Sequence, residues 1–212
     1  MVNVGAGTGS YEPPDRFVVA VEPSQTMIDQ RAGRSPHVVR GVAECLPFPD
    51  RAFDAALAVL TVHHWSDRAA GLAELCRVAH RQVVLIFEPL EVHRFWALEY
   101  FEEARALSIE RNAPGEALLC EHLNVSEVQT VMVPADCDDG FGAAFWARPE
   151  RYLDPDVQAG MSWIALLPEP ARARATKQLA GDLASGEWDR RFGHLRTEAA
   201  WDAGYRLVIA HN

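Results

Sequence analysis

Long apolar runs are missing from this chain, and so is a charged N-terminal segment followed by a short apolar one. A membrane-spanning helix needs ~20 apolar residues in a row, so we expect none, and no secretory signal is visible. Cysteine is scarce and scattered, without the C-x-x-C or histidine spacing of a metal site, at Cys45, Cys76, Cys120 and Cys137. This pattern predicts reduced thiols, no metal and a cytoplasmic location.

Positive charge is in deficit. The 212 residues carry 30 acidic and 20 Lys and Arg side chains, a formal net charge of −10. Such a field repels a phosphate backbone, and the arginines are dispersed, which argues against a nucleic-acid partner and for a small-molecule one. With 49% hydrophobic residues, the chain can form one compact domain over 1–212. No feature indicates an oligomeric state.

Short apolar runs alternate with helical patterns in the first part of the chain. Continuous runs of this type suit parallel strands that are buried on both faces, and the intervening segments begin with capping residues. The alternation predicts a doubly wound parallel α/β sheet. The expected strands are Phe17–Val21, Val38–Val42, Ala55–Leu60 and Gln82–Phe87, and the expected helices are Ser24–Arg31 and Asp67–Ala79.

After Pro89 the pattern changes. A long helix is expected at His93–Arg111, because Phe95, Leu98, Phe101 and Ala104 recur in three-residue steps. Two further strands and two further helices complete the prediction, as a helical insertion that caps the sheet before the last strand. They are Val128–Val133, Tyr205–Ala210, Asp156–Leu166 and Pro170–Ala184.

The most informative segment is the start of the chain, where an apolar strand enters a glycine-dense turn. Gly5, Gly7 and Gly9 read G-x-G-x-G, and the next apolar strand ends on Glu22. Glycines let a backbone approach a ligand closely, and a carboxylate ending the next strand can accept hydrogen bonds from both hydroxyls of a ribose. The sequence therefore predicts a site for a nucleotide-like cofactor. A plain β-turn is the alternative for the glycines, and a helix cap for Glu22.

Four ordered blocks in the first half resemble the class I S-adenosylmethionine (SAM)-dependent methyltransferases, in particular the type 11 group that acts on small molecules. The blocks are Val4–Gly9, Val21–Ser24 with Met27, Gly41–Phe48, and Phe53-Asp54 with Leu60–Trp65. The resemblance covers roughly residues 1 to 90 and is loose beyond them. It implies a Rossmann-like, mostly parallel seven-stranded sheet, with a cofactor half at 1–90 and a cap and substrate half at 91–212.

The resemblance also implies where SAM binds. The glycine segment would line its methionine part, Glu22 its ribose, and Met27 and the Ala43-Glu44 pair its adenine, although Glu44 could equally be a solvated loop charge. The residues expected to bind the cofactor are Gly5, Ala6, Gly7, Thr8, Gly9, Glu22, Pro23, Met27, Ala43, Glu44 and Leu60.

His63 and His64 follow the strand where the transferred methyl group is expected to emerge. An imidazole titrates near neutral pH and can take a proton from an attacking hydroxyl or amine, so either histidine is a candidate catalytic base; one of them could instead cap the next helix. Trp65, Trp96 and Trp146 are candidates for an acceptor pocket, with core packing as the alternative.

Three departures from the family weaken the match. Pro13 and Pro14 stand where the first helix should follow the glycines, and proline disrupts helix interiors. Asn3 replaces the acidic residue that many relatives use near the cofactor's ammonium group, and Met1 stands directly at the first strand.

These departures motivate an alternative, a SAM-binding or degenerate protein of the same fold without transferase activity. An NAD-dependent or nucleotide-sugar oxidoreductase is disfavoured, because the third glycine of G-x-G-x-x-G and a Tyr-x-x-x-Lys pair are absent. The main hypothesis is in-line methyl transfer to a small-molecule acceptor.

Overall fold

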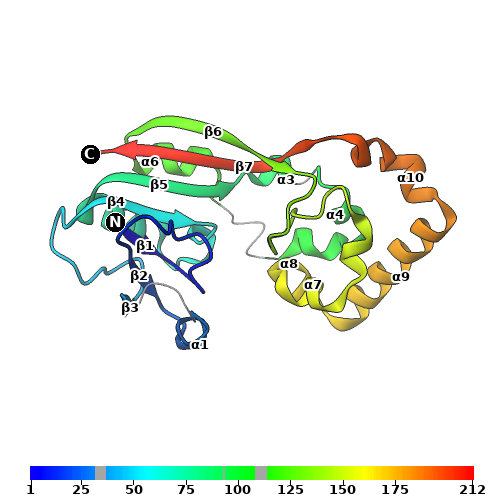
Figure 1. The fold of residues 1–212 in the computed structure, drawn as a ribbon, viewed down its shortest axis with the longest axis horizontal. Helices are drawn as coiled ribbons and strands as arrows, with labels where there is room; N and C mark the ends of the chain where they lie inside the picture. Colours follow the sequence, from blue (N-terminus) through cyan, green and yellow to red (C-terminus); the bar gives the residue numbers. More distant parts are fainter. Residues whose placement is uncertain (32–36, 93, 108–113) are drawn as a thin grey trace. The chain divides into compact units, whose positions relative to one another are not determined.

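A seven-stranded sheet organises the protein, with strand order β3-β2-β1-β4-β5-β7-β6 (Figure 1). The computed structural model describes residues 1–31, 37–92, 94–107 and 114–212. The strands are β1 Val2–Val4, β2 Val19–Glu22, β3 Val38–Arg40, β4 Phe53–Val59, β5 Ala79–Phe87, β6 Val125–Pro134 and β7 Ala200–His211. The predicted doubly wound, mostly parallel fold is confirmed.

The strand pairings place three carboxyl ends at one edge of the sheet. β1 lies between β2 and β4 and is parallel to both, with Asn3 opposite Ala20 and Leu57. β7 runs antiparallel to β5, with Val208 opposite Val84. The carboxyl ends of β1, β2 and β4 therefore meet, which is where ligands bind in open α/β sheets.

The described residues divide into two compact units. The first contains Met1–Glu88, Ala113–Thr130 and Tyr205–Asn212, and the second contains Pro89–Asn112 and Val131–Gly204. In the first unit, an aliphatic core forms where α2 Arg68–Val78 and α6 Glu116–His122 cover the sheet, with Leu72, Leu75 and Leu119 fully buried. The second unit has an aromatic core.

The remaining helical elements are short, apart from one in the second unit. They are α1 Gln25–Asp29, η1 Val62–His64, α3 Pro89–Val92, α4 Ala97–Tyr100, η2 Glu102–Ala106, η3 Pro149–Leu153, α7 Pro155–Gly160, α8 Ser162–Ala165, α9 Glu169–Ser185, α10 Glu187–Phe192 and η4 Gly193–Thr197. No helix of the described ranges has the length and apolarity needed to cross a bilayer.

Two helix predictions for the second half were wrong in their extent. The expected helix His93–Arg111 is interrupted at Phe101, and the described part consists of α4 and the 3-10 turn η2; His93 and residues 108–111 lie outside the described residues. Strict three-residue spacing of the apolar side chains fits the 3-10 period of 3.0 better than the α period of 3.6. The expected helix Asp156–Leu166 divides at Met161, after Gly160, a residue of low helix propensity.

Between β1 and β2 the sequence predicted that Pro13 and Pro14 disrupt the helix expected after the glycines. The structure confirms this: residues 5–18 contain only turns and bends. The helices starting at Gln25 and Arg68 are capped as expected, by the side chains of Ser24 and Asp67.

Candidate cofactor-binding site

The glycine loop follows β1 and carries three residues with positive φ, Gly5 at 70°, Gly7 at 53° and Gly9 at 83°. At Gly5 a Cβ atom would come within 1.9 Å of Thr61 Oγ1, so only glycine fits there. At Gly7 a Cβ atom would meet none of the described residues within 4 Å. The backbone of Gly7 is thus bare, in a conformation that favours glycine, and is open to a ligand.

Glu22 ends β2 and is 6% exposed. Its Oε2 accepts a hydrogen bond from the N–H of Gly7 at 2.8 Å, and its Oε1 accepts one from the N–H of Ser24 at 2.9 Å. The cap of α1 is Ser24, whose Oγ accepts from the N–H of Met27 at 3.4 Å. Glu22 is therefore not the helix cap, and its carboxylate is oriented by two backbone N–H groups, one in the glycine loop and one at the start of α1.

Two side chains that sequence reasoning missed complete the loop. Arg31 donates from Nη1 to the carbonyl oxygen of Gly7 at 3.0 Å and from Nη2 to Glu12 Oε1 at 2.5 Å. Glu12 Oε1 also accepts from Asn3 Nδ2 at 3.3 Å. No sequence motif predicts this buried ion pair, because Glu12 precedes β2 in the sequence and Arg31 follows it.

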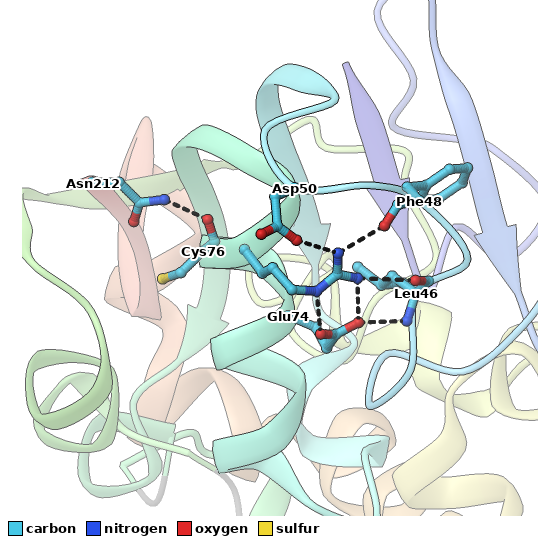
Figure 2. A network of polar contacts seen from close by, with 7 residues as sticks. Leu46, Phe48, Asp50, Glu74, Cys76 and Asn212 are labelled. Atoms are coloured by element: carbon cyan, nitrogen blue, oxygen red, sulfur yellow. Dashed lines mark hydrogen bonds and ion pairs between the residues drawn. The ribbon is translucent and has the colours of Figure 1, made fainter.

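The loop after β3 contains Ala43 and Glu44, and α2 holds it in place. Arg77 donates to the carbonyl oxygens of Phe48 and Leu46 at 2.7 and 3.0 Å, while Glu74 Oε2 accepts from the N–H of Leu46 at 2.7 Å. Figure 2 shows this network, in which Arg77 also bonds to the carboxylates of Glu74 and Asp50. In the sequence, Glu74 and Arg77 stand three residues apart on a predicted helix, and this spacing is the signal from which their ion pair could have been predicted.

Glu44 binds the next strand's loop. Its Oε1 accepts from the N–H and Oγ of Ser66 at 2.7 and 2.8 Å, and from the N–H of Asp67 at 3.1 Å. Partial burial acts to raise the pKa of Glu44, but these hydrogen bonds outweigh it and lower the pKa. The carboxylate is charged and joins the two loops that follow β3 and β4.

The turn after β4 begins with a strained residue. Leu60 has φ 49°, one of two non-glycine residues with positive φ among the described residues, and its N–H still bonds to Leu85 O at 2.9 Å. Left-handed backbone costs a residue with a Cβ about 1–2 kcal/mol. Such strain concentrates at functional sites, and here it turns Thr61 against Gly5 and leads into η1 with His63 and His64.

The two histidines differ in their surroundings. His63 is half-buried, with its ring centroid 5.1 Å from that of Phe87 and 4.0 Å from that of His64. Desolvation, then the charges of His64 and Arg68, lower the pKa of His63 to about 3. His64 is more exposed; desolvation lowers its pKa too, but the negative charge of Glu22 opposes the shift. His64 is the stronger base of the two and feels the charge of Glu22.

The other predicted site residues vary in exposure. Pro23 and Met27 are exposed, and 43% of Met27 is accessible, while Ala6 and Ala43 are buried. The hydroxyl of Thr8 forms a hydrogen bond with that of Ser10. Trp65 packs in the core of the first unit against Gly71. In the second unit Trp146 is fully buried and donates from Nε1 to Val133 O, and Trp96 donates to Trp146 O. These contacts account for the three tryptophans as core residues; an acceptor-binding role stays a prediction.

Together these features define a class of protein. The sheet has a parallel centre with an antiparallel β7, a bare glycine turn after β1 and a buried carboxylate at the end of β2. This arrangement is typical of α/β proteins that bind a nucleoside-containing cofactor at the carboxyl ends of the central parallel strands.

Comparisons with known proteins identify the family. Residues 2–87 match the "Methyltransferase domain" family of type 11. The fold matches a crystal structure from Anabaena variabilis, described as "Putative methyltransferase from antibiotic biosynthesis pathway", with a TM-score of 0.90 and 32% identity, over 100% of this chain and 90% of that one. The chain belongs to the class I SAM-dependent methyltransferases of type 11.

Two curated relatives match over shorter stretches. The ubiquinone/menaquinone biosynthesis C-methyltransferase UbiE of Geobacter sulfurreducens is 30% identical over 51% of this chain and 50% of its own length. The tRNA (carboxymethyluridine(34)-5-O)-methyltransferase of Saccharomyces cerevisiae is 34% identical over 32% of this chain and 25% of its own length. The chain thus spans at most half the length of these two relatives.

Proposed function

We propose that this protein transfers a methyl group from SAM to a small-molecule acceptor. The observation that carries the proposal is the carboxylate of Glu22. An ionised carboxylate has about four lone-pair sites, and the N–H groups of Gly7 and Ser24 occupy two of them. Among the described residues no other hydrogen bond to this carboxylate is found, so two acceptor sites remain on a group whose orientation is already set, and they match the two hydroxyls of a ribose.

The residues present fit the cofactor. The bare backbone of Gly7 leaves room for its methionine part, and the exposed Met27 supplies an apolar surface for adenine. When bound, SAM supplies a methyl group that is already activated by its sulfonium. The protein's own task is then to orient the two reactants and to exclude water.

His64 is our candidate for the group that accepts a proton from the acceptor. It lies after β4, within the influence of the Glu22 charge, whereas the lowered pKa of His63 makes that imidazole a weak base at neutral pH. The net charge of −10 supports a small molecule over tRNA as the acceptor. A radiolabelled methyl group from SAM should appear in small hydroxylated or amine compounds and not in tRNA.

The first test is calorimetric titration with S-adenosylhomocysteine, with NAD as the comparison ligand. We expect saturable binding of S-adenosylhomocysteine alone. Glu22→Gln should weaken it about 10- to 100-fold, because the amide nitrogen cannot accept, and a lost hydrogen bond to a charged group costs about 1.5–3 kcal/mol. Glu121→Gln, at an exposed position of α6, is the control and should bind as the parent does. Absence of binding by the parent would refute the proposal, and binding without methyl transfer would favour the alternative of a degenerate methyltransferase.

A further inference from the structure

The glycine loop of this chain returns to the sheet without a helix. Two turns follow one another, closed by the bonds from Gly9 N–H to Ala6 O at 2.9 Å and from Glu12 N–H to Gly9 O at 3.2 Å. In many nucleotide sites a helix begins at this point and holds the loop. Here the second turn brings Glu12 back beside Asn3 of β1.

A buried ion pair occupies this position. The side chains of Arg31 and Glu12 are 4% and 5% exposed and 2.5 Å apart. The guanidinium also supports the loop sterically, since a Cβ atom at Gly9 would come within 3.0–3.1 Å of its atoms. The pair thus lies directly against the backbone of the glycine loop.

Gly7 is held from both sides as a result. Its N–H donates to Glu22 at 2.8 Å, and its carbonyl oxygen accepts from Arg31 at 3.0 Å. On its open side, a Cβ atom at Gly7 would have no neighbour within 4 Å in the part of the chain that the structure describes. The loop glycine with open space beside its Cα is therefore also the one whose N–H and carbonyl groups both bond to side chains.

Stability alone is a poor explanation for this pair. Burying two opposite charges costs desolvation that their attraction only partly offsets, and apolar replacements are often as stable. In addition, Glu12 Oε2 and Arg31 Nε are buried and have no hydrogen-bond partner among the described residues. What the ion pair achieves, and an apolar pair could not, is the hydrogen bond from a fixed guanidinium to Gly7.

We propose that Glu12 and Arg31 are positioning residues that hold the glycine loop in its cofactor-binding conformation, in place of the absent helix. Arg31 acts through Gly7, and Glu12 acts by fixing Arg31. The inference rests on the proposed function, because it assumes that this loop contacts the methionine part of the cofactor. A loop that is ordered before binding loses less entropy on binding, which strengthens affinity.

The test compares two ligands that differ in the part near the loop. Calorimetry measures Kd for S-adenosylhomocysteine and for adenosine, which lacks the amino-acid part. Arg31→Lys keeps the charge, but a single ammonium cannot reproduce the two-pronged contact with Glu12 and Gly7. We expect the Kd for S-adenosylhomocysteine to rise about tenfold, which corresponds to about 1.4 kcal/mol, while the Kd for adenosine changes less than about threefold.

Controls separate positioning from damage to the fold. Arg174→Lys is the matched control, since Arg174 forms a two-pronged ion pair with Glu103 on the exposed surface of the second unit, and both Kd values should stay at the parent's. If Arg31→Lys does not fold, the isosteric Glu12→Gln takes its place, with a smaller selective loss of about threefold. Equal changes for both ligands, or none, in a folded variant would overturn the inference alone. Absence of S-adenosylhomocysteine binding by the parent would overturn the proposed function as well.

Discussion

The two units of this protein are built from different side chains. The core of the first is aliphatic, made of valine, alanine, leucine and isoleucine, with Trp65 as its one tryptophan. The other five of the six tryptophans belong to the second unit, where edge-to-face and tilted ring contacts connect them with one another and with phenylalanine and tyrosine rings. They are Trp96, Trp146, Trp163, Trp188 and Trp201.

The difference follows from the secondary structure of each unit. Parallel strands offer closely spaced positions on two faces, which small branched side chains fill. The second unit consists largely of short helices and 3-10 turns, such as η3 and α8, which present few side chains each. Large rings then bury much area per residue. In the first unit, hydrogen bonds and ion pairs of charged and backbone groups fix the loops. In the second unit, contacts between aromatic rings fix the helices.

The largest expected effect tests the aromatic core. Trp146→Ala should lower the free energy of unfolding by about 3–5 kcal/mol, because it leaves a cavity and removes the donor to Val133 O. Leu72→Ala, at a fully buried position of the first unit, should cost about 2–5 kcal/mol. Urea unfolding followed by tryptophan fluorescence, which reports mainly the second unit, and by circular dichroism measures both. A loss below about 1 kcal/mol for Trp146→Ala would show that the ring is not a core residue.

A smaller effect concerns acid stability of the first unit. The pKa of His63 is lowered to about 3 in the folded protein by desolvation, against about 6.5 in an unfolded chain. Below about pH 6.5 the unfolded state therefore binds the proton that the folded state excludes, and stability falls until about pH 3. The slope from this group is at most about 1.4 kcal/mol per pH unit, and less where solvent reaches the ring.

Urea unfolding at several pH values between 7 and 4 measures this slope, in about one-unit steps. In His63→Asn the slope should be shallower than in the parent, because the group that titrates has been removed. The control is His122→Asn, at an exposed position of α6, measured over the same pH range. Identical slopes for the parent and His63→Asn would show that His63 is as accessible to protons as in the unfolded chain.

The last comparison contrasts two glycines, and the change at the first of them has the smallest expected effect. Gly181 is exposed in α9, and a Cβ atom there would meet nothing within 4 Å. Gly181→Ala should stabilise the protein by about 0.5–1 kcal/mol, because alanine is the better helix former. At Gly5 the same change forces a Cβ atom into Thr61 and should destabilise the protein and abolish cofactor binding. Thermal unfolding checks both, and a stable Gly5→Ala variant would show that the loop can rearrange.

Prediction from the sequence succeeded for the strands, because runs of apolar residues and the order of those runs along the chain indicate where strands form. The apolar runs located the strands to within a few residues, although β5 and β7 extend further than expected, to Ala79 and Ala200. It failed where helices are short: α6 and α10 were missed. The role of Glu88 was missed also, since its carboxylate accepts from the N–H of Glu116 at the start of α6, at 3.1 Å.

By itself the sequence determined the family, the order of the strands along the chain, and the positions of the glycine turn and of Glu22. Those features depend on residues that are near one another in the chain. Only the tertiary structure decided that Arg31 reaches Gly7, that Glu12 replaces a helix, and that Arg77 holds the loop after β3. These contacts join residues 19 to 29 positions apart, and a hydrogen bond at that separation exists only because folding brings its two groups together.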